Sequence, residues 1–173
     1  MIRPITLGEL TQLAVLLADC FPPPLNPGGW GTALWQRTIE QDVRQRWERE
    51  GDKMLWLGVW RGTVLTGAVE LSQRQWLHVH YIYLANLAVA VAYRRQGLGR
   101  QLLTAAEAAV QTWPQENLYL HVMENNQVAR RLYQGLGYQV ERWEWTWQTW
   151  LGGPKRLLLA KPLCRYNQEC SQA

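Results

Sequence analysis

Two glycines and a group of arginines follow an apolar segment near the middle of the chain. Arg94 and Arg95 precede Gly97 and Gly99, and Arg100 follows them. The apolar residues before this turn predict a buried strand, and the Gly- and Pro-free pattern after it predicts a helix. Unpaired amides at a helix N-terminus carry partial positive charge, about half an elementary charge, and glycine lets the backbone approach an anion closely. The segment is therefore predicted to bind the phosphate or pyrophosphate of a phosphorylated ligand.

Two other phosphate-binding motifs do not fit this segment. A P-loop needs a Lys-Ser or Lys-Thr pair, and the chain contains neither. A dinucleotide fingerprint needs a third glycine three positions after Gly99, where this chain has Leu102. A plain strand–helix connection without a ligand remains an alternative for this segment taken alone.

A second motif lies further along the chain. A short apolar strand, a polar turn and a helix are followed by a glycine and a tyrosine, in a pattern formed by Asn126, Ala129, Leu132, Tyr133, Gly137 and Tyr138. Together the two motifs resemble those of the GCN5-related N-acetyltransferase (GNAT) family, over about residues 54–162. A looser similarity, in residues 71–75 and 85–89, is to plastid-type dual lysine and N-terminal acetyltransferases.

The resemblance implies acetyl-coenzyme A as cosubstrate, without a metal ion. In the family the glycine-bearing turn binds the pyrophosphate, here Arg94, Arg95, Gln96, Gly97, Leu98, Gly99 and Arg100. The backbone of Leu87, Ala88 and Val89 would pair with the pantetheine arm as an added strand. Asn125, Asn126 and Tyr133 would complete the cofactor site. The amide near Leu87 would donate to the oxyanion, again by analogy with the family.

Acetyl transfer from a thioester to an amine also needs an acid and a base. Tyr133 matches the family tyrosine near the sulfur and is predicted to protonate the leaving thiolate; packing alone is the alternative. His121 is the predicted base, because it occupies the position of a glutamate in ribosomal-protein N-terminal acetyltransferases of the RimI type. A neutral imidazole titrates near the working pH and can accept a proton.

The base has other candidates. Many relatives carry a glutamate on the strand before the pyrophosphate turn, but residues 83–86 of this chain hold no carboxylate. His121 could instead be hydrogen-bonded within the sheet, and a water chain would need no dedicated residue. Weaker candidate bases are Glu70, His78, His80 and Glu124.

The predicted acceptor is a primary amine of a protein, either an N-terminal α-amine or a lysine, attacked directly in a ternary complex. Trp145, Trp147 and Glu70 are the predicted acceptor-binding residues. Trp143, Trp145 and Trp147 alternate along a predicted strand, which favours core or interface packing as the other interpretation. A small-molecule amine (a polyamine, arylalkylamine or aminoglycoside) and a non-catalytic acyl-coenzyme A sensor are the alternative functions.

The elements that position these residues follow from periodicity and turn signals. Strands are expected at residues 2–5, 54–60, 63–72, 81–92, 118–123, 138–147 and 156–160, and helices at 7–18, 32–50, 97–112 and 126–136. This order predicts an α/β (α+β) fold with a mixed, mostly antiparallel sheet and helices on both faces. The resemblance adds a splayed parallel strand pair, as in the acyl-coenzyme A N-acyltransferase fold.

Composition is that of an ordinary globular domain. The 173 residues are 47% hydrophobic and 18% charged, with a net charge of +4. One domain is expected over residues 1–163, with a frayed tail at 164–173. Nucleic acid is an unlikely partner, because no basic helix, aromatic RNA-binding motif or zinc spacing is present. Three cysteines without Cys-x-x-Cys spacing and no signal peptide or membrane span predict a cytoplasmic protein. A homodimer is left open.

Overall fold

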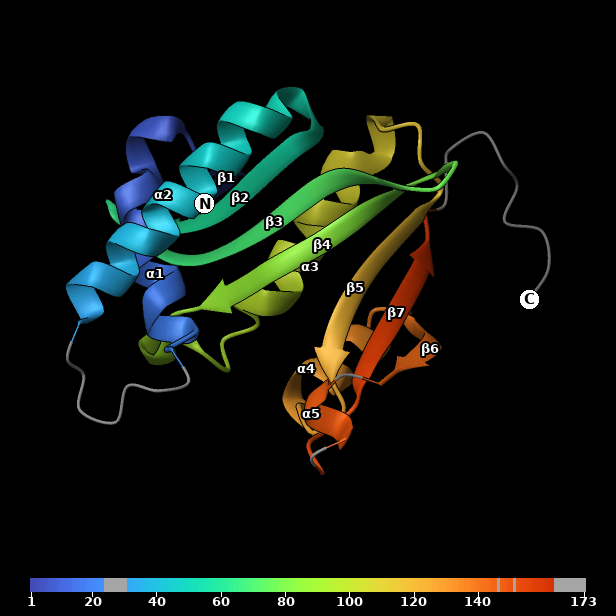
Figure 1. The fold of residues 1–173 in the computed structure, drawn as a ribbon. Coiled ribbons are helices and arrows are strands. Elements are labelled where there is room, and N and C mark those ends of the chain that lie inside the picture. Colours follow the sequence, from blue (N-terminus) through green and yellow to red (C-terminus); the bar gives the residue numbers. More distant parts are fainter. Residues whose placement is uncertain (24–30, 146, 151, 164–173) are drawn as a thin grey trace. The chain divides into compact units, whose positions relative to one another are not determined.

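The computed structural model describes residues 1–23, 31–145, 147–150 and 152–163 (Figure 1). Its strands are β1 (Ile2–Pro4), β2 (Met54–Arg61), β3 (Val64–Trp76), β4 (Val79–Val89), β5 (Asn117–Met123), β6 (Gln139–Glu144) and β7 (Arg156–Pro162). Its α-helices are α1 (Leu10–Cys20), α2 (Thr32–Glu50), α3 (Leu98–Ala109), α4 (Gln127–Gln134) and α5 (Trp147–Trp150). None of the helices described is long and apolar enough to cross a membrane.

Among the described residues, the strands form one sheet with the order β1-β2-β3-β4-β5-β7-β6. Antiparallel pairs join β1 to β2, β2 to β3, β5 to β7 and β6 to β7. β4 and β5 are parallel, with Ile82 to Leu84 paired to Leu118 to Leu120. The predicted mixed, mostly antiparallel sheet with a parallel pair is confirmed.

The chain divides into two compact units. The first comprises Met1–Ser72 and Asn86–Ala106, and the second Gln73–Ala85 and the residues from Glu107 onward. β3, β4 and α3 each contribute to both units. The two units are described separately below.

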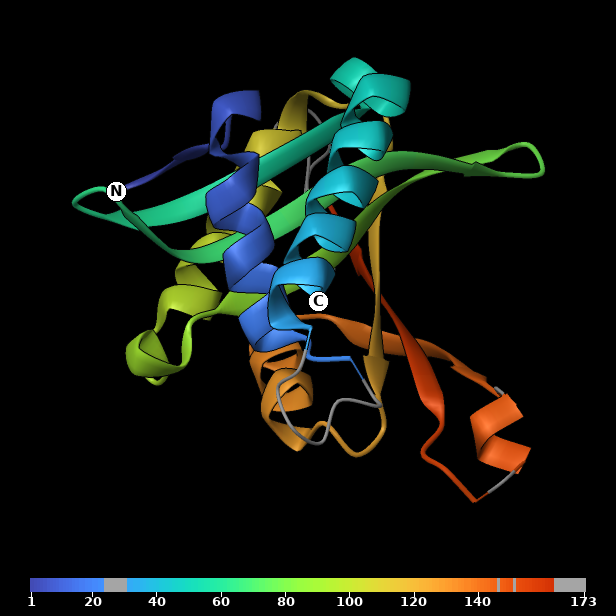
Figure 2. The same ribbon diagram turned by 60° about the vertical axis from the view of Figure 1, so that its left-hand side comes forward.

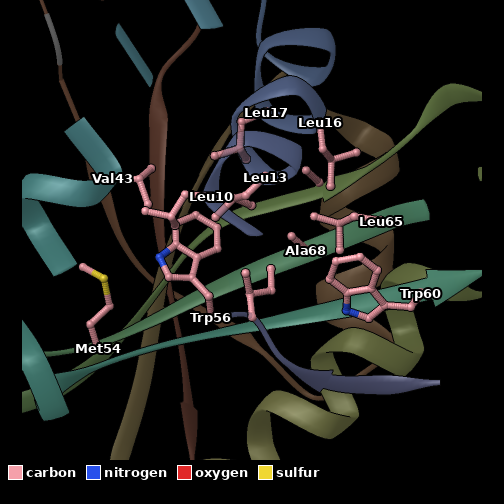
Figure 3. Close-up of a cluster of buried hydrophobic side chains, with 12 residues drawn as sticks. Leu10, Leu13, Leu16, Leu17, Val43, Met54, Trp56, Trp60, Leu65 and Ala68 are labelled. Atoms are coloured by element: carbon pink, nitrogen blue, oxygen red, sulfur yellow. The ribbon is translucent and has the colours of Figure 1, made fainter. Parts of the chain in front are cut away.

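The core of the first unit lies between two helices and a strand pair (Figure 3). α1 and α2 lie side by side over one face of β1, β2 and β3, and α3 lies on the opposite face (Figures 1 and 2). Buried side chains fill the first interface, among them Leu10, Leu13, Leu17, Val43, Trp56, Trp60 and Ala68. On the other face, Gly67 of β3 leaves room for Leu102 of α3, whose Cδ1 would be 3.1 Å from an added Cβ.

The second unit is organised by the two-residue period of β5. Leu118, Leu120 and Val122 are buried on one face, and Tyr119 and His121 are half-buried on the other. This alternation follows from the pleat, which directs successive side chains to opposite faces of a sheet. β7 lies between β5 and β6 and pairs with both, so that His121 is next to Leu158 and Glu144 is next to Arg156.

Most predicted elements are present within a few residues of their predicted bounds, but two predictions were wrong. A turn does lie between residues 73 and 80, but the flanking strands are longer than predicted: β3 continues to Trp76 instead of ending at 72, and β4 already begins at Val79 instead of 81. Leu77 lies in this turn with φ of +55°. The strand expected to reach Trp147 ends at Glu144, and a short helix, α5, begins at Trp147. The predicted tail at 164–173 lies outside the described residues.

Candidate active site

The glycine-bearing turn of the first unit presents backbone amides at the start of α3. Among the described residues, the amides of Gln96 to Gly99 have no backbone acceptor, whereas the amide of Gln101, two residues after Gly99, donates to the Gly97 carbonyl at 3.0 Å. Arg95 and Gly97 have φ of +64° and +77°. Such a local reversal of the backbone gathers amides into a concave anion site. The turn therefore has the donors that a pyrophosphate needs.

Gly97 tests this fit further. An added Cβ would have only the Gln101 Nε2 atom nearby, at 3.9 Å. The space that a side chain would take at Gly97 is thus open in the free protein. The sequence-predicted turn residues are brought together here. The Arg94 side chain is held at the end of β4, because its Nε donates to the Val89 carbonyl at 2.9 Å.

The end of β4 has a backbone edge suited to an added strand. The Ala90 amide donates to the Thr66 carbonyl of β3 at 2.9 Å, so this side of β4 is directed at β3. Because successive backbone groups point to alternate edges, those of Leu87 and Val89 point the other way. The recorded parallel pairs with β5 end at Leu84. The backbone groups of Leu87 therefore fit the predicted pairing with a pantetheine amide. The Val89 carbonyl already accepts from Arg94 Nε at 2.9 Å and from Cys20 Sγ at 3.5 Å, so its part in that pairing stays a prediction.

A buried ion pair holds the backbone just before that edge. The Glu70 side chain is 1% exposed. Arg46 Nη1 donates to both of its carboxylate oxygens, at 2.8 and 2.9 Å. The Asn86 side chain donates to the same carboxylate at 2.6 Å. Asn86 has φ of +50°, a conformation that asparagine tolerates better than most residues. Glu70 therefore has a structural role, and its burial leaves it no surface for the predicted contact with the acceptor.

The second unit contains a chain of hydrogen bonds with the predicted base, His121, at its centre. The Tyr83 hydroxyl lies 2.7 Å from His121 Nδ1, and His121 Nε2 lies 3.1 Å from Glu144 Oε2. Arg156 donates to the same Glu144 oxygen at 2.7 and 3.0 Å. Because an ionised carboxylate only accepts, Nε2 must carry the imidazole proton, and Nδ1 then accepts from Tyr83. We call Tyr83, His121 and Glu144 the proton relay.

The electrostatics keep this arrangement neutral at His121. Burial lowers the pKa of His121, although the hydrogen bond to Glu144 opposes the shift. Burial opposes ionisation of Glu144, but hydrogen bonds from Arg156 and His121 outweigh it and lower its pKa. Burial raises the pKa of Tyr83. At neutral pH the relay is thus a phenol, a neutral imidazole whose Nδ1 accepts from that phenol, and a carboxylate.

Sequence reasoning missed Tyr83, because it searched that strand only for a carboxylate. The signal was present in the alternation of β4 and β5. Tyr83 is paired with Tyr119, two residues before His121, in the parallel register. A tyrosine next to a histidine on one face of adjacent strands could therefore have been inferred once the pairing was known.

Tyr133 is held in α4 as an uncharged phenol. It is 6% exposed, and its ring packs edge-to-face against Tyr138 at 5.7 Å. Burial, with a smaller contribution from Tyr83, raises its pKa to about 12. Within the described residues its hydroxyl has no recorded hydrogen-bond partner. A protonated, uncommitted phenol is chemically suited to the predicted role of acid.

The remaining polar candidates have local roles. Asn126 caps α4, with its Oδ1 accepting from the Ala129 amide at 3.1 Å, and Asn125 is exposed beside it. Glu124 accepts from the Lys155 amide at 3.3 Å. His78 and His80 are exposed at the β3–β4 hairpin.

Trp143 lies in β6, and Trp145 and Trp147 follow that strand, so the three do not alternate along one strand as predicted. Trp145 is 65% exposed, and Trp143 is also exposed, so neither packs in the core. Lys155 Nζ lies 4.6 Å from the Trp145 ring centre and 5.5 Å from that of Trp143. The side chain of Trp147 lies outside what the structure describes. Contact of Trp145 and Trp147 with the acceptor stays a prediction.

Comparison with known proteins identifies the class. The sequence model described as "Acetyltransferase (GNAT) family" matches residues 10–138. The chain therefore belongs to the GNAT acetyltransferase family, as its motifs suggested. The acyl-coenzyme A N-acyltransferase fold expected from the resemblance is also confirmed.

Individual relatives agree with this class. The chain is 31% identical to GCN5-related N-acetyltransferase 7, chloroplastic, from Arabidopsis thaliana, over 111 residues that cover 56% of this chain and 40% of that protein. The fold matches the ribosomal-protein-S18-alanine N-acetyltransferase from Escherichia coli with a TM-score of 0.71, at 19% identity, over 100% and 99% of the two chains. It also matches the PaiA N-acetyltransferase from Thermoplasma acidophilum in complex with coenzyme A, with a TM-score of 0.68, at 19% identity, over 94% and 98%.

The chain spans less than half the length of the curated relatives named here and below, 40% and 32% of the first two. Several of these relatives are named chloroplastic, as is GCN5-related N-acetyltransferase 10 from the same plant. The cytoplasmic location predicted from the sequence of this chain stays a prediction.

Proposed function

We propose that this chain is an acetyl-coenzyme A-dependent N-acetyltransferase whose acceptor is a protein amine, an N-terminal α-amine or a lysine. The proton relay is the observation that carries the proposal, because amine acetylation requires a group that removes a proton near neutral pH. The amides of Gln96 to Gly99, which have no backbone acceptor among the described residues, support the cosubstrate. Solved neighbours include proteins named as acetyltransferases of ribosomal-protein alanine residues.

Acetyl-coenzyme A, when bound, supplies the thioester acetyl group. Gln96 to Gly99 would hold its diphosphate, and the Leu87–Val89 backbone edge would align its pantetheine arm. The Arg46–Glu70–Asn86 network fixes the backbone that precedes this edge.

The proton relay gives the acceptor amine a route for its proton. Tyr83 Oη can accept that proton while its own proton passes to His121 Nδ1, 2.7 Å away. No phenolate forms in this transfer, so the raised pKa of Tyr83 does not prevent it. The resulting imidazolium is stabilised by Glu144, which accepts from Nε2. Tyr133 keeps its proton at neutral pH and can donate it to the departing thiolate.

The test combines acetyl-coenzyme A with an equimolar mixture of a lysine-containing N-terminally blocked peptide, an unblocked peptide without lysine, spermidine and an arylalkylamine. Mass spectrometry then identifies the acetylated product. Acetylation of either peptide supports the proposal, and Tyr83→Phe should reduce it. Acetylation of the small amines alone, or of nothing while coenzyme A still binds, would contradict it.

A further inference from the structure

An open cavity of about 320 Å³ lies next to the proton relay in the second unit. Tyr83, His121 and Glu144 line one part of it. The rest of its lining is largely apolar or aromatic, formed by Leu77, Val79, Tyr81, Tyr119 and Leu158, with Glu141 and Arg142. A volume of this size is at the lower end of the range of ligand pockets, about 300–1,000 Å³.

The walls of this cavity are built by the register of four strands. Tyr81 and Tyr119 lie on β4 and β5 and contact each other edge-to-face, with ring centres 5.5 Å apart. Leu158 of β7 is paired with His121. On β6 the register shifts between Val140 and Arg142. A bulge of this kind re-aims side chains, and here the neighbours Glu141 and Arg142 both line the cavity.

The spacing between relay and aromatic wall matches one amino-acid residue. Tyr119 and His121 are two residues apart on β5, which is about 6.6 Å along a strand. By ordinary bond lengths, an α-amine nitrogen and the far end of a leucine, methionine or phenylalanine side chain lie roughly 5–6 Å apart. An amine placed at Tyr83 therefore puts the side chain of the same residue against Tyr81 and Tyr119. A lysine Nζ, at the end of an unbranched chain, carries no such group beside it.

Both signs of charge line the cavity, because Arg142 lies there with Glu141 and Glu144. Arg142 is paired with Glu144 at 3.3 Å, so the charge that disfavours an acidic side chain is that of Glu141. Among the described residues, Glu141 forms no ion pair. Burial, and to a smaller extent the negative charge of Glu141, raise the pKa of the nearby Tyr119. Val79 is 64% exposed, and Leu77 and Glu141 are exposed as well, so the cavity stays open to solvent. The rest of an extended acceptor polypeptide can pass out of the cavity on this open side, whereas a small amine needs no such opening.

We infer that this cavity binds the side chain of the first residue of an acceptor polypeptide, and that the enzyme selects N-terminal α-amines on large apolar residues. This inference rests on the proposed function and narrows it. Glycine in the first position would leave the cavity empty, and glutamate would place a second carboxylate next to that of Glu141.

The experiment uses peptides that are identical except for a first residue of Phe, Leu, Gly or Glu, together with phenethylamine. The value of kcat/KM should be at least tenfold higher for the Phe and Leu peptides than for the Gly peptide, and lowest for Glu. Equal values for all four peptides would overturn the inference and leave the proposed function standing. Phenethylamine acetylated as efficiently as the Phe peptide would overturn the assignment to a polypeptide.

Matched variants locate the effect. Val79→Arg puts a cation at the cavity, and Val64→Arg makes the same change at a valine of β3 that is 53% exposed and does not line it. Val79→Arg should reduce kcat/KM for the Phe peptide at least fivefold. It should also reduce the ratio of the kcat/KM values for the Phe and Glu peptides. Val64→Arg should change neither. Equal effects of the two variants would contradict the placement of the side chain in this cavity.

A binding measurement separates this inference from the proposed function. Calorimetry in the presence of coenzyme A should show tighter binding of the Phe peptide than of the Gly peptide, and Val79→Arg should remove the difference. That result without any acetylation would refute the proposed function and keep the binding site. Acetylation of both peptides, together with equal affinities for the Phe and Gly peptides, would refute the binding site and keep the proposed function.

Discussion

Replacement of Gly97 by alanine should weaken coenzyme A binding and, for a different reason, also lower the stability of the fold. The free protein has room for the new Cβ, whose nearest neighbour would be Gln101 Nε2 at 3.9 Å. The cost to stability comes from φ of +77°, which costs an L-residue with a side chain about 1–2 kcal/mol. In a protein of this size, each kcal/mol lowers Tm by roughly 2–4 °C.

The loss of affinity has a different source. The Cβ occupies space on the side where a diphosphate approaches the amides of Gln96 to Gly99. A hydrogen bond to a charged group contributes about 1.5–3 kcal/mol, so the loss of one reduces affinity by roughly 10- to 100-fold. Coenzyme A binding measured by isothermal titration calorimetry reports this loss, and thermal unfolding reports the strain.

Gly62 supplies the matched control. It lies in the β2–β3 hairpin with φ of +59°, and an added Cβ would have nothing within 4 Å. Gly62→Ala should therefore lower Tm about as much as Gly97→Ala and leave the Kd of coenzyme A unchanged. Identical Kd values for the wild type and both variants would refute the assignment of the turn as the diphosphate site. A Tm loss confined to Gly97→Ala would refute the estimate of strain.

Three further predictions concern single groups. Tyr133→Phe should lower kcat at least tenfold with little change in the Kd of coenzyme A, and wild-type turnover would remove the proposed acid. Burial holds the pKa of His121 below its usual value near 6.5. For an acceptor amine of low pKa, kcat/KM should therefore not change with pH around pH 7 and should fall as the pH drops below 6.5. A decline in kcat/KM that begins above pH 7 would contradict this direction. The same shift means that the contribution of His121 to stability is present above pH 6.5 and is lost as the pH falls through its folded-state pKa. Glu70→Gln breaks a buried ion pair and should destabilise the protein by about 3 kcal/mol, whereas Glu48→Gln, on the exposed face of α2, should stay within about 0.5 kcal/mol in urea unfolding.

The sequence predicted the parts of the fold that depend on local pattern. The helix at Thr32–Glu50 and the strand at Met54–Arg61 have strong periodicity and clear ends, and they lie at or within one residue of the predicted positions. The connection around Leu77 was expected to be a longer loop, because leucine is not a usual residue of a tight turn; its φ is +55°. The strand through Trp145 was overextended because alternation of large and polar residues is also compatible with an exposed segment.

The candidate site divides in the same way. The glycine turn and Tyr133 belong to contiguous motifs, so the sequence alone indicated them. Tyr83 and Glu144 become relevant only through strand pairing that brings them to His121, and such pairing is not visible from spacing. Glu70 was misassigned because a lone glutamate gives no sign of the arginine, Arg46, that pairs with it from α2.

The most direct test of the account is a double-mutant cycle on the proton relay, with the single-turnover rate of acetyl transfer as readout. Tyr83→Phe and His121→Gln should each slow the transfer by about 10²- to 10⁴-fold, the usual contribution of a general base. Because the two residues pass one proton, the double variant should be no slower than the slower single variant. Rate losses that multiply in the double variant, or wild-type rates in either single variant, would contradict the relay.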